Sequence, residues 1–359
     1  MRAVVLKRHG GLDALEYEPA WPVPEPGPGE ALIKVAACGM NNTDVNTRAG
    51  WYSKSVTEAT TGAAYETLDS RQDNTWGGAG VRFPRIQGAD VCGHVVALGE
   101  GADRALLGQR VITDNWLRDW EDPLNRNKTG YYGSEADGGF AEYTAIDARN
   151  VAAVKSDLSD AELATFSCSY STAEGMIERA QVTPEDVVLV TGASGGVGGA
   201  LVQLAKRRGA TVVALASEAK HADVARCRPD AILPRAPEDL GAALMSAIGQ
   251  DTVSVVADIV AGDYFPTLID VLERGGRYTT SGAIAGPIVS LDVRSLYLKD
   301  LTFTGSTVIP PAIFSNLVRY IEAGDLIPLV AATYPLERFH EAQQAFIDKK
   351  HTGNIVVVP

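Results

Sequence analysis

Apolar and polar positions alternate between two periods in the middle of the chain. Short apolar runs at 187–190, 211–216 and 253–260 are typical of strands that are buried on both faces. Between the first two runs, the segment 198–209 repeats its apolar residues at helical spacing and ends at Gly209. This alternation predicts a parallel sheet with helices on both faces, the doubly wound α/β fold. The further elements that it predicts are helices at 218–227, 238–248 and 263–273 and strands at 230–234, 277–282 and 301–306.

The pattern changes on either side of this segment. The N-terminal part contains short runs with period-two alternation, which are typical of an antiparallel, barrel-like domain. These runs read RAVVLKR, EALIKVAACGM, GHVVALG and QRVITDN. The C-terminal tail predicts one helix, a turn and a last strand. A chain of 359 residues is long for a single core, so we expect two domains.

A loop of small residues, GASGGVG at 192–198, joins the first central strand to its helix. It stands where dinucleotide-binding folds carry their glycine fingerprint, although Ala193 replaces the first glycine of the strict pattern. Gly195 leaves room for a pyrophosphate beside the backbone, and the helix N-terminus offers N–H groups and a partial positive charge. A tight structural turn would have a similar sequence. We expect the following residues to bind cofactor phosphates: Ser194, Gly195, Gly196, Val197 and Gly198.

The end of the second central strand bears on the choice of cofactor. Ser217 occupies the position where an acidic residue would bind the ribose 2′-hydroxyl of NADH, and Lys220 follows one turn later. This pairing favours NADPH over NADH, with Ser217 and Lys220 on the 2′-phosphate. The acidic Glu218 counts in the other direction, and Lys220 is also compatible with a solvated position on a helix.

Composition narrows the partners and the location. The net charge is −13 and no basic patch stands out, so neither nucleic acid nor a membrane surface is expected as a partner. No apolar run has the length of a signal peptide core or a membrane span. The four cysteines are widely scattered, which does not indicate a disulfide framework. We therefore expect a cytoplasmic protein that acts on a small molecule.

Eight motifs along the chain together resemble the medium-chain dehydrogenase/reductase superfamily. Besides the loop at 192–198 they are CGMNNTDVNTRAG (38–50), GHVVALGEG (93–101), GQRV (108–111), DGGFAEY (137–143), SCSYSTAEGMI (167–177), GGRYTTSGAIAG (275–286) and HTGNIVV (351–357). The resemblance implies hydride transfer with a nicotinamide cofactor, in a cleft between two domains. It also implies cofactor contacts from Thr172, Gly282 and Asn354.

The same resemblance implies the domain plan and the oligomeric state. A GroES-like antiparallel β-barrel catalytic domain, 1–154 and 306–359, would enclose a Rossmann dinucleotide-binding domain at 155–305. Members of the superfamily usually form dimers by extending the sheets of the cofactor domains edge to edge. In this sequence that edge would fall near 290–307.

Zinc-dependent members of the superfamily hold a catalytic metal with two cysteines and a histidine. Cys38 and Cys168 match the cysteines, but the family's Gly-His-Glu is replaced by Gly88-Ala89-Asp90, and alanine binds no metal. A replacement set of Cys38, Asp90 and Cys168, with Cys92 as a further candidate, stays open, as does the alternative that all four cysteines are buried apolar residues. His94 lies in a strand and is expected in a wall or core. Because 112–136 contains no cysteine, a structural zinc site is also not expected.

Without zinc, an unactivated ketone is a poor hydride acceptor, whereas an enone or quinone spreads the new charge onto oxygen. The sequence thus resembles the zinc-free, quinone-oxidoreductase-like branch. Asn41 and Asn42 follow Cys38 where the family lines the nicotinamide pocket, and Tyr52 matches a tyrosine that this branch places over the site. Tyr52 would donate a hydrogen bond or relay a proton, or else serve as a lid or core aromatic. Asp44 is expected to orient its loop.

Two other functions stay open: a zinc-dependent alcohol dehydrogenase with the atypical ligand set, and a non-catalytic NADPH-binding protein. Substrate size would depend on an insertion at 53–82, for which we expect a lid over the cleft. A second stretch, 115–139, is expected to line the same mouth. Both segments are also compatible with decorated surface or a dimer contact. The aromatic residues of the second stretch are Trp116, Trp120, Tyr131 and Tyr132.

Overall fold

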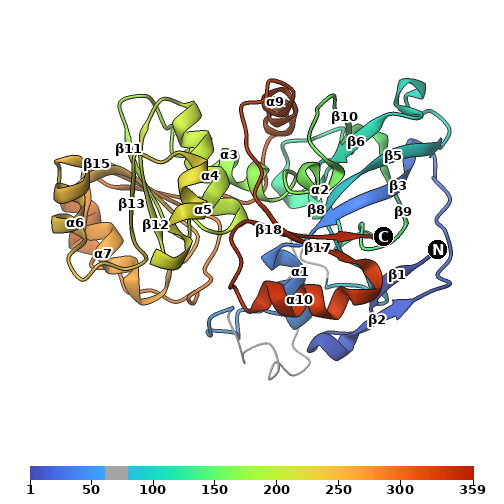
Figure 1. Cartoon of the computed structure of the whole chain (residues 1–359), viewed down its shortest axis with the longest axis horizontal. Coiled ribbons are helices and arrows are strands. Elements are labelled where there is room, and N and C mark those ends of the chain that lie inside the picture. The colour runs from blue at the N-terminus through green and yellow to red at the C-terminus, as the bar shows by residue number, and fades with distance from the viewer. Residues whose placement is uncertain (61–79) are drawn as a thin grey trace. The chain divides into compact units, whose positions relative to one another are not determined.

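The computed structural model describes residues 1–60 and 80–359, and the lid predicted for 53–82 falls largely on the residues outside this description. The chain forms two compact units (Figure 1). Unit 1 comprises Met1–Val56, Gly62–Cys168 and Pro310–Pro359, and unit 2 comprises Thr57–Thr61 and Ser169–Ile309. The domain ranges given above stay a prediction.

Unit 2 contains a six-stranded sheet in the order β13-β12-β11-β14-β15-β16, with every neighbouring pair parallel. The strands are β11 (Val187–Val190), β12 (Thr211–Ala216), β13 (Ala231–Pro234), β14 (Val253–Asp258), β15 (Leu272–Thr280) and β16 (Thr302–Gly305). The helices are α3 (Ser169–Arg179), α4 (Gly196–Arg207), α5 (His221–Val224), α6 (Leu240–Ile248), α7 (Phe265–Asp270) and α8 (Val293–Leu298). This order, in which the chain starts in the middle and then crosses to the other half, confirms the predicted doubly wound fold.

The apolar runs that predicted the central strands lie in the core of unit 2. Leu189, Val213 and Val256, from three adjacent strands, pack in one cluster with Leu244 of α6 and Leu268 of α7. Burial of such residues supplies most of the free energy that holds the layers together. The last predicted helix is shorter than the expected 263–273, because the chain already enters the sheet at the start of β15.

Unit 1 is built mainly from antiparallel strands around β3, which pairs with β5, β9 and β18. The strands are β1 (Ala3–Leu6), β2 (Leu15–Glu18), β3 (Glu30–Gly39), β4 (Arg85–Ile86), β5 (Asp90–Leu98), β6 (Arg110–Thr113), β7 (Trp116–Leu117), β8 (Gly130–Tyr131), β9 (Tyr143–Asp147), β10 (Val151–Ala153), β17 (Val330–Pro335) and β18 (Asn354–Val358). The helices are α1 (Asn42–Ala49), α2 (Asp160–Leu163), α9 (Pro311–Glu322) and α10 (Phe339–Ile347). The C-terminal strand β18 thus joins the N-terminal strands in one sheet, and only its pairing with β17 is parallel within that sheet.

Several expectations for single side chains of unit 1 are wrong, and those for His94 and Tyr132 are among them. His94 is exposed, because it lies on the outer face of β5 opposite the exposed Lys34 of β3. Tyr132 lines no mouth and no surface: it is fully buried in the core of unit 1, and its hydroxyl hydrogen-bonds with the Thr144 hydroxyl. Period-two alternation predicts the strand that contains His94 but not which of its faces is buried, and the pattern of the 115–139 stretch does not show which of its aromatic side chains point into the core.

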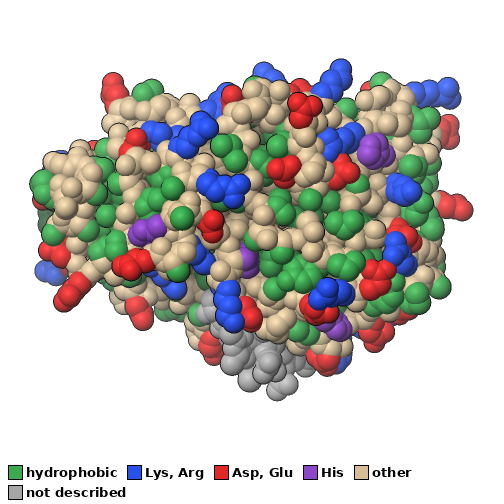
Figure 2. Space-filling model, viewed as in Figure 1, with side chains coloured by type: hydrophobic (Ala, Val, Ile, Leu, Met, Phe, Trp, Pro, Cys, Tyr) green, Lys and Arg blue, Asp and Glu red, His purple; other side chains and the backbone are tan. Residues whose placement is uncertain are grey.

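The described surface carries charges of both signs. On the face seen in Figure 2, Lys and Arg side chains are interspersed with Asp and Glu side chains and with apolar residues. Within residues 1–60 and 80–359, no helix combines the length and the hydropathy that crossing a membrane requires. All four cysteines are buried and none forms a disulfide.

Candidate functional site

The small-residue loop lies between β11 and α4, at the carboxyl edge of the parallel sheet. Gly192 adopts a left-handed conformation with φ 59°, and Gly195 is the N-cap of α4. A Cβ added to Gly198 would lie 2.1 Å from the Gly192 carbonyl oxygen, so only glycine allows the helix to approach the turn this closely. A Cβ on Gly195 would meet its nearest atom at 3.5 Å, in ordinary contact. The predicted phosphate-binding residues 194–198 are therefore together at a helix N-terminus whose first N–H groups face outward from the helix.

Of the cofactor residues that the family resemblance implies, Gly282 and Thr172 belong to unit 2 and Asn354 belongs to unit 1. Gly282 follows β15, and a Cβ there would lie 3.1 Å from the Ile259 carbonyl oxygen, while one on Gly192 would lie 3.1 Å from the Ile259 side chain. Gly282 and the loop thus border the same segment after β14. Thr172 is half-buried in α3, which packs against α4. Asn354, in contrast, belongs to unit 1, where it is buried at the start of β18.

A cationic pair lies beyond the ends of β12 and β13. Ser217 is exposed directly after β12, and Lys220 is half-buried in the turn that follows. Arg235 comes directly after β13, whose Pro234 pairs with Ala216 of β12. Burial lowers the pKa of Lys220, and the positive charge of Arg235 lowers it further. Two cations that repel one another here favour a bound dianion.

Sequence reasoning did not find Arg235. The fingerprint concerns only the first two strands, and Arg235 follows the third. The signal that would have found it is the predicted order of the sheet, because the carboxyl ends of neighbouring parallel strands meet at one edge.

Unit 1 contains a second candidate group, which we name the acid–thiol cluster: Cys38, Asn41, Asp44, Asp90 and Cys168. Asn41 is at its centre as the N-cap of α1. Its backbone N–H donates to Asp44 at 2.8 Å, and its side-chain amide donates to Asp90 at 2.9 Å. The second oxygen of Asp90 accepts the backbone N–H of Cys168, and Asp44 also accepts the Gly88 N–H at 3.2 Å. Cys38 belongs to β3 and Asp90 to β5, and these two strands pair with each other. Asn41 and Asp44 both belong to the start of α1, and Cys168 follows α2.

The cluster is buried and short of positive charge. Burial raises the pKa of Asp44 to about 7. Burial also raises the pKa of Asp90 to about 7, with a contribution from the charge of Asp44. For the same reasons the pKa values of the Cys38 and Cys168 thiols are raised, through burial first and the nearby carboxylates second. The cluster therefore favours neutral, hydrogen-bonding forms of its side chains.

Tyr131 completes the cluster, although no motif marked it as a site residue. Its hydroxyl donates to the Cys168 sulfur at 3.1 Å and accepts the Asn115 amide at 3.1 Å. Trp116 packs edge-on against its ring, with centroids 5.1 Å apart. Sequence reasoning placed Tyr131 and Trp116 in a stretch lining the mouth of the cleft, whereas both side chains are buried inside unit 1.

The atypical zinc set does not fit a metal ion in this arrangement. Asp90 uses both oxygens to accept N–H groups, and Cys168 accepts the Tyr131 hydroxyl. Across the part of the chain that the structure describes, no three Cys, His, Asp or Glu side chains are grouped as metal ligands. Cys92, the further candidate, contacts Asp160 at 3.6 Å instead.

Tyr52 reaches the cluster through Thr43. The Tyr52 hydroxyl hydrogen-bonds with the side chains of Thr43 and Asn46 from α1, and the Thr43 hydroxyl also hydrogen-bonds with Cys168. Burial raises the pKa of Tyr52, so its hydroxyl stays protonated. Asn42 is directed elsewhere, because its side-chain oxygen accepts a hydrogen bond from Lys349 at 2.7 Å.

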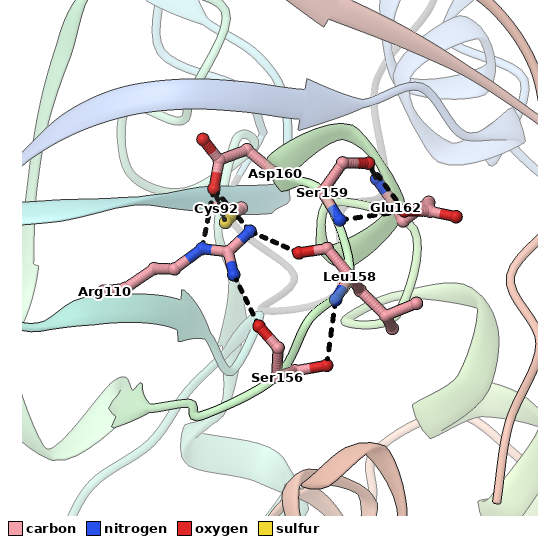
Figure 3. Close-up of polar contacts among 7 residues, drawn as sticks. All are labelled: Cys92, Arg110, Ser156, Leu158, Ser159, Asp160 and Glu162. Atoms are coloured by element: carbon pink, nitrogen blue, oxygen red, sulfur yellow. Dashed lines mark hydrogen bonds and ion pairs between the residues drawn. The ribbon is translucent and has the colours of Figure 1, made fainter. Parts of the chain in front are cut away.

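A partly exposed ion pair between Arg110 and Asp160 anchors the start of α2, the helix that precedes Cys168 (Figure 3). Arg110 of β6 binds Asp160, the first residue of α2, at 2.7 Å. The same guanidinium donates to the carbonyl oxygens of Ser156 at 3.0 Å and Leu158 at 2.6 Å. Because α2 ends only five residues before Cys168, this clamp fixes the position from which the Cys168 N–H reaches Asp90.

The comparisons with known proteins agree with this architecture. Residues 27–156 match the alcohol dehydrogenase GroES-like domain, and residues 196–323 match the zinc-binding dehydrogenase family. The fold is similar to that of a candidate alcohol dehydrogenase from Sinorhizobium meliloti 1021, with a TM-score of 0.91, 46% identity, and coverage of 100% of this chain and 96% of the other.

Two curated relatives are similar over nearly their full length. The acryloyl-coenzyme A reductase of Metallosphaera sedula is 26% identical, with 99% of each chain covered. The quinone oxidoreductase of Lama guanicoe is also 26% identical, with 100% of this chain and 97% of the relative covered. The predicted GroES-like and Rossmann fold class is therefore confirmed.

Proposed function

Since the chain belongs to the medium-chain dehydrogenase/reductase superfamily of nicotinamide-dependent oxidoreductases, we propose that it transfers hydride from NADPH to a conjugated carbonyl compound without a catalytic metal. The observation that carries this proposal is the acid–thiol cluster. Its hydrogen bonds already occupy both oxygens of Asp90 and the sulfur of Cys168, and Ala89 stands in place of the metal-binding histidine. An enone or quinone suits such a site, because its reduction places charge on an oxygen that neutral donors can stabilise.

Unit 2 supplies the cofactor-binding groups. When bound, the reduced nicotinamide provides the hydride. The loop at 192–198 and the N-terminus of α4 receive the pyrophosphate, because their N–H groups and the helix dipole favour an anion. Ser217, Lys220 and Arg235 bind the 2′-phosphate, which supports NADPH over NADH. Glu218 is exposed beside them and is the group that would weaken this preference.

Unit 1 supplies neutral hydrogen-bond donors. Tyr52 holds its proton, and its hydroxyl is oriented by Thr43 and Asn46. We assign to Tyr52 the hydrogen bond to the enolate oxygen or the proton that completes the reduction. Asn41 acts through the cluster, where it fixes both carboxyl groups. Asn42 contributes less, because Lys349 already holds its side-chain oxygen.

A substrate and cofactor panel tests this function. NADPH and NADH oxidation are measured in parallel with enones, quinones, aldehydes and simple ketones. We expect turnover of enones or quinones with NADPH and only weak turnover of simple ketones. Preferred turnover of simple ketones or alcohols would contradict the proposal, and cofactor binding without any turnover would indicate a non-catalytic NADPH-binding protein.

We also propose that the protein is a homodimer formed through β16. This strand is at the edge of the parallel sheet, where one of its sides has no neighbouring strand among the described residues. In the segment that precedes β16 in the chain, Ile288, Val293, Tyr297 and Leu298 are all more than half exposed, at 69%, 60%, 59% and 56%. Exposed apolar side chains of this kind favour association. Light scattering of the purified chain should give twice the mass of 38.0 kDa, and a monomer would contradict this proposal.

A further inference from the structure

Asp258, the last residue of β14, is a buried carboxylate that neither the motif nor the proposed chemistry uses. It lies next to the switch point of the sheet, where the chain order reverses between β11 and β14. Its side chain is fully buried, with 0% exposure. A carboxyl group in such a position is costly to bury unless hydrogen bonds compensate for lost water.

Hydrogen bonds reach this carboxyl group from three strand ends. Oδ1 accepts the Thr191 hydroxyl at 2.5 Å and the Val260 backbone N–H at 2.8 Å. Oδ2 accepts the Tyr278 hydroxyl at 2.7 Å. The Ala261 N–H lies 3.2 and 3.1 Å from the two oxygens. One side chain thus connects the carboxyl ends of β11, β14 and β15.

The turn after β14 depends on these bonds. Ala261 has φ 54° and ψ −139°, a backbone conformation that residues with a side chain rarely adopt. Such a conformation persists only where the surroundings hold it. The two contacts from the Ala261 N–H to Asp258 provide that restraint, and the Thr191 hydroxyl adds another by accepting the Ile259 N–H at 3.1 Å.

This turn lies against Gly192, which opens the small-residue loop, and against Gly282, one of the predicted cofactor residues. A Cβ on Gly192 would lie 3.1 Å from the Ile259 side chain and 3.2 Å from that of Val260. The Ile259 carbonyl oxygen lies 3.1 Å from the Cβ position of Gly282, and the Val260 carbonyl accepts the Ala285 N–H at 2.8 Å. Any shift of the turn would therefore move the loop at Gly192 or the segment at Gly282.

We propose that Asp258 is a positioning residue that holds the segment after β11 and the turn after β14, and through that turn the segment at Gly282, in the geometry that binds a nicotinamide dinucleotide. The carboxylate touches no reacting atom. It acts through Thr191, which directly precedes Gly192, and through the turn at 259–261. The inference rests on the proposed function only in requiring such a cofactor, and it applies to NADPH and NADH alike.

The test compares cofactor affinity with turnover in Asp258→Asn. This substitution keeps the shape but replaces one acceptor oxygen by an amide N–H that faces other donors. We expect the Kd for NADPH and for NADH, measured by fluorescence titration, to rise at least about tenfold, as loss of a hydrogen bond to a charged group implies. At saturating cofactor, kcat should fall less than about threefold, because the substitution leaves the donors of unit 1 in place. Amide exchange at 191–199 should also become faster in the protein without cofactor.

Tyr278→Phe is the matched control. It removes a buried donor to the same carboxyl group but leaves every bond to Thr191 and to the turn, so its Kd should stay within about twofold of the unmodified value. If Asp258→Asn does not fold, Thr191→Val replaces it and should raise Kd in the same direction. An unchanged Kd in Asp258→Asn or its replacement, or an equal rise in Tyr278→Phe, would overturn the inference. If the unmodified chain binds neither dinucleotide, the proposed function fails as well.

Discussion

The cofactor loop of unit 2 and the acid–thiol cluster of unit 1 are built in opposite ways. The loop is a single contiguous segment, and its geometry depends on the backbone and on glycines that keep side chains out. The cluster collects side chains from β3, α1, β5 and the segment after α2, and these segments meet only in the folded chain. A site made of backbone is therefore visible as a motif, whereas a site made of distant side chains is visible only in three dimensions.

We expect the largest effect from a substitution that disrupts the loop at 192–198. In Gly198→Ala, the new methyl group would lie 2.1 Å from a backbone oxygen, so α4 must move away from the turn. We expect a loss of about 3 kcal/mol in the free energy of unfolding, at the upper end for overpacking, together with loss of NADPH binding. Urea unfolding and fluorescence titration measure the two effects.

Gly195→Ala is the matched control for that substitution. Its methyl group has no neighbour nearer than 3.5 Å, so the free energy of unfolding should change by less than about 1 kcal/mol. NADPH affinity should still fall, because the methyl group occupies the approach of the pyrophosphate. Equal losses in the free energy of unfolding of the two variants would show that the close contact at Gly198 does not determine the loss of stability.

The next largest effect is expected on kcat in Tyr52→Phe, where a catalytic role and a structural role of the hydroxyl predict different results. Tyr52→Phe should lower kcat about 100-fold if the hydroxyl donates to the substrate oxygen or transfers the proton. Unfolding should become easier by only about 1 kcal/mol, because one hydrogen-bonding group is lost. Steady-state kinetics with an enone measures the first change. Trp51→Phe, which alters the neighbouring ring, is the control and should keep kcat, and a drop of equal size in both variants would favour a lid or core role for Tyr52.

A smaller effect is expected on the affinity for NADPH when the cations near Ser217 are removed. Lys220→Ala and Arg235→Ala should each raise the Kd for NADPH about tenfold, since each removes one charge-assisted contact to phosphate. The Kd for NADH should not change. Arg226→Ala, which removes an exposed cation from the same region, is the control and should leave both values unchanged. NADPH affinity that does not respond to Lys220 or Arg235 would contradict the assignment of these residues to the 2′-phosphate.

The last effect concerns how the stability of the cluster depends on pH. Because the pKa of Asp44 is about 7 in the folded chain and about 4 in an unfolded one, the folded state binds its proton more tightly between these values. Stability therefore declines as pH rises from about 4 to about 7 and levels off above. Asp44→Asn should make this decline of stability with pH shallower. The pH dependence that remains in the variant is then due to Asp90, whose pKa is also raised. Urea midpoints between pH 5 and 8 measure the slope, and the exposed Asp223→Asn should leave it as it was.

The features that the sequence predicts are those built from contiguous segments, and the features that it does not predict depend on contacts between distant residues. Alternating periods predicted the doubly wound sheet, and the glycines at 192–198 predicted the turn and helix N-terminus that the structure contains. The place of Asn41 after Cys38 predicts a site residue, but its contact with Asp90, 49 residues further on, depends on how α1 starts beside β5. Tyr131, Thr43 and Arg235 carried no local signal, because their importance comes from what they face across strands or helices.

The most direct test of the central claim combines metal analysis with turnover. The protein is purified, treated exhaustively with a strong chelator, and assayed for NADPH oxidation with an enone while its zinc content is measured. We predict unchanged kcat at far less than one zinc per chain. One zinc per chain, with activity lost on its removal and restored on its return, would contradict the account and indicate an alcohol dehydrogenase that uses Cys38 and Cys168 as ligands.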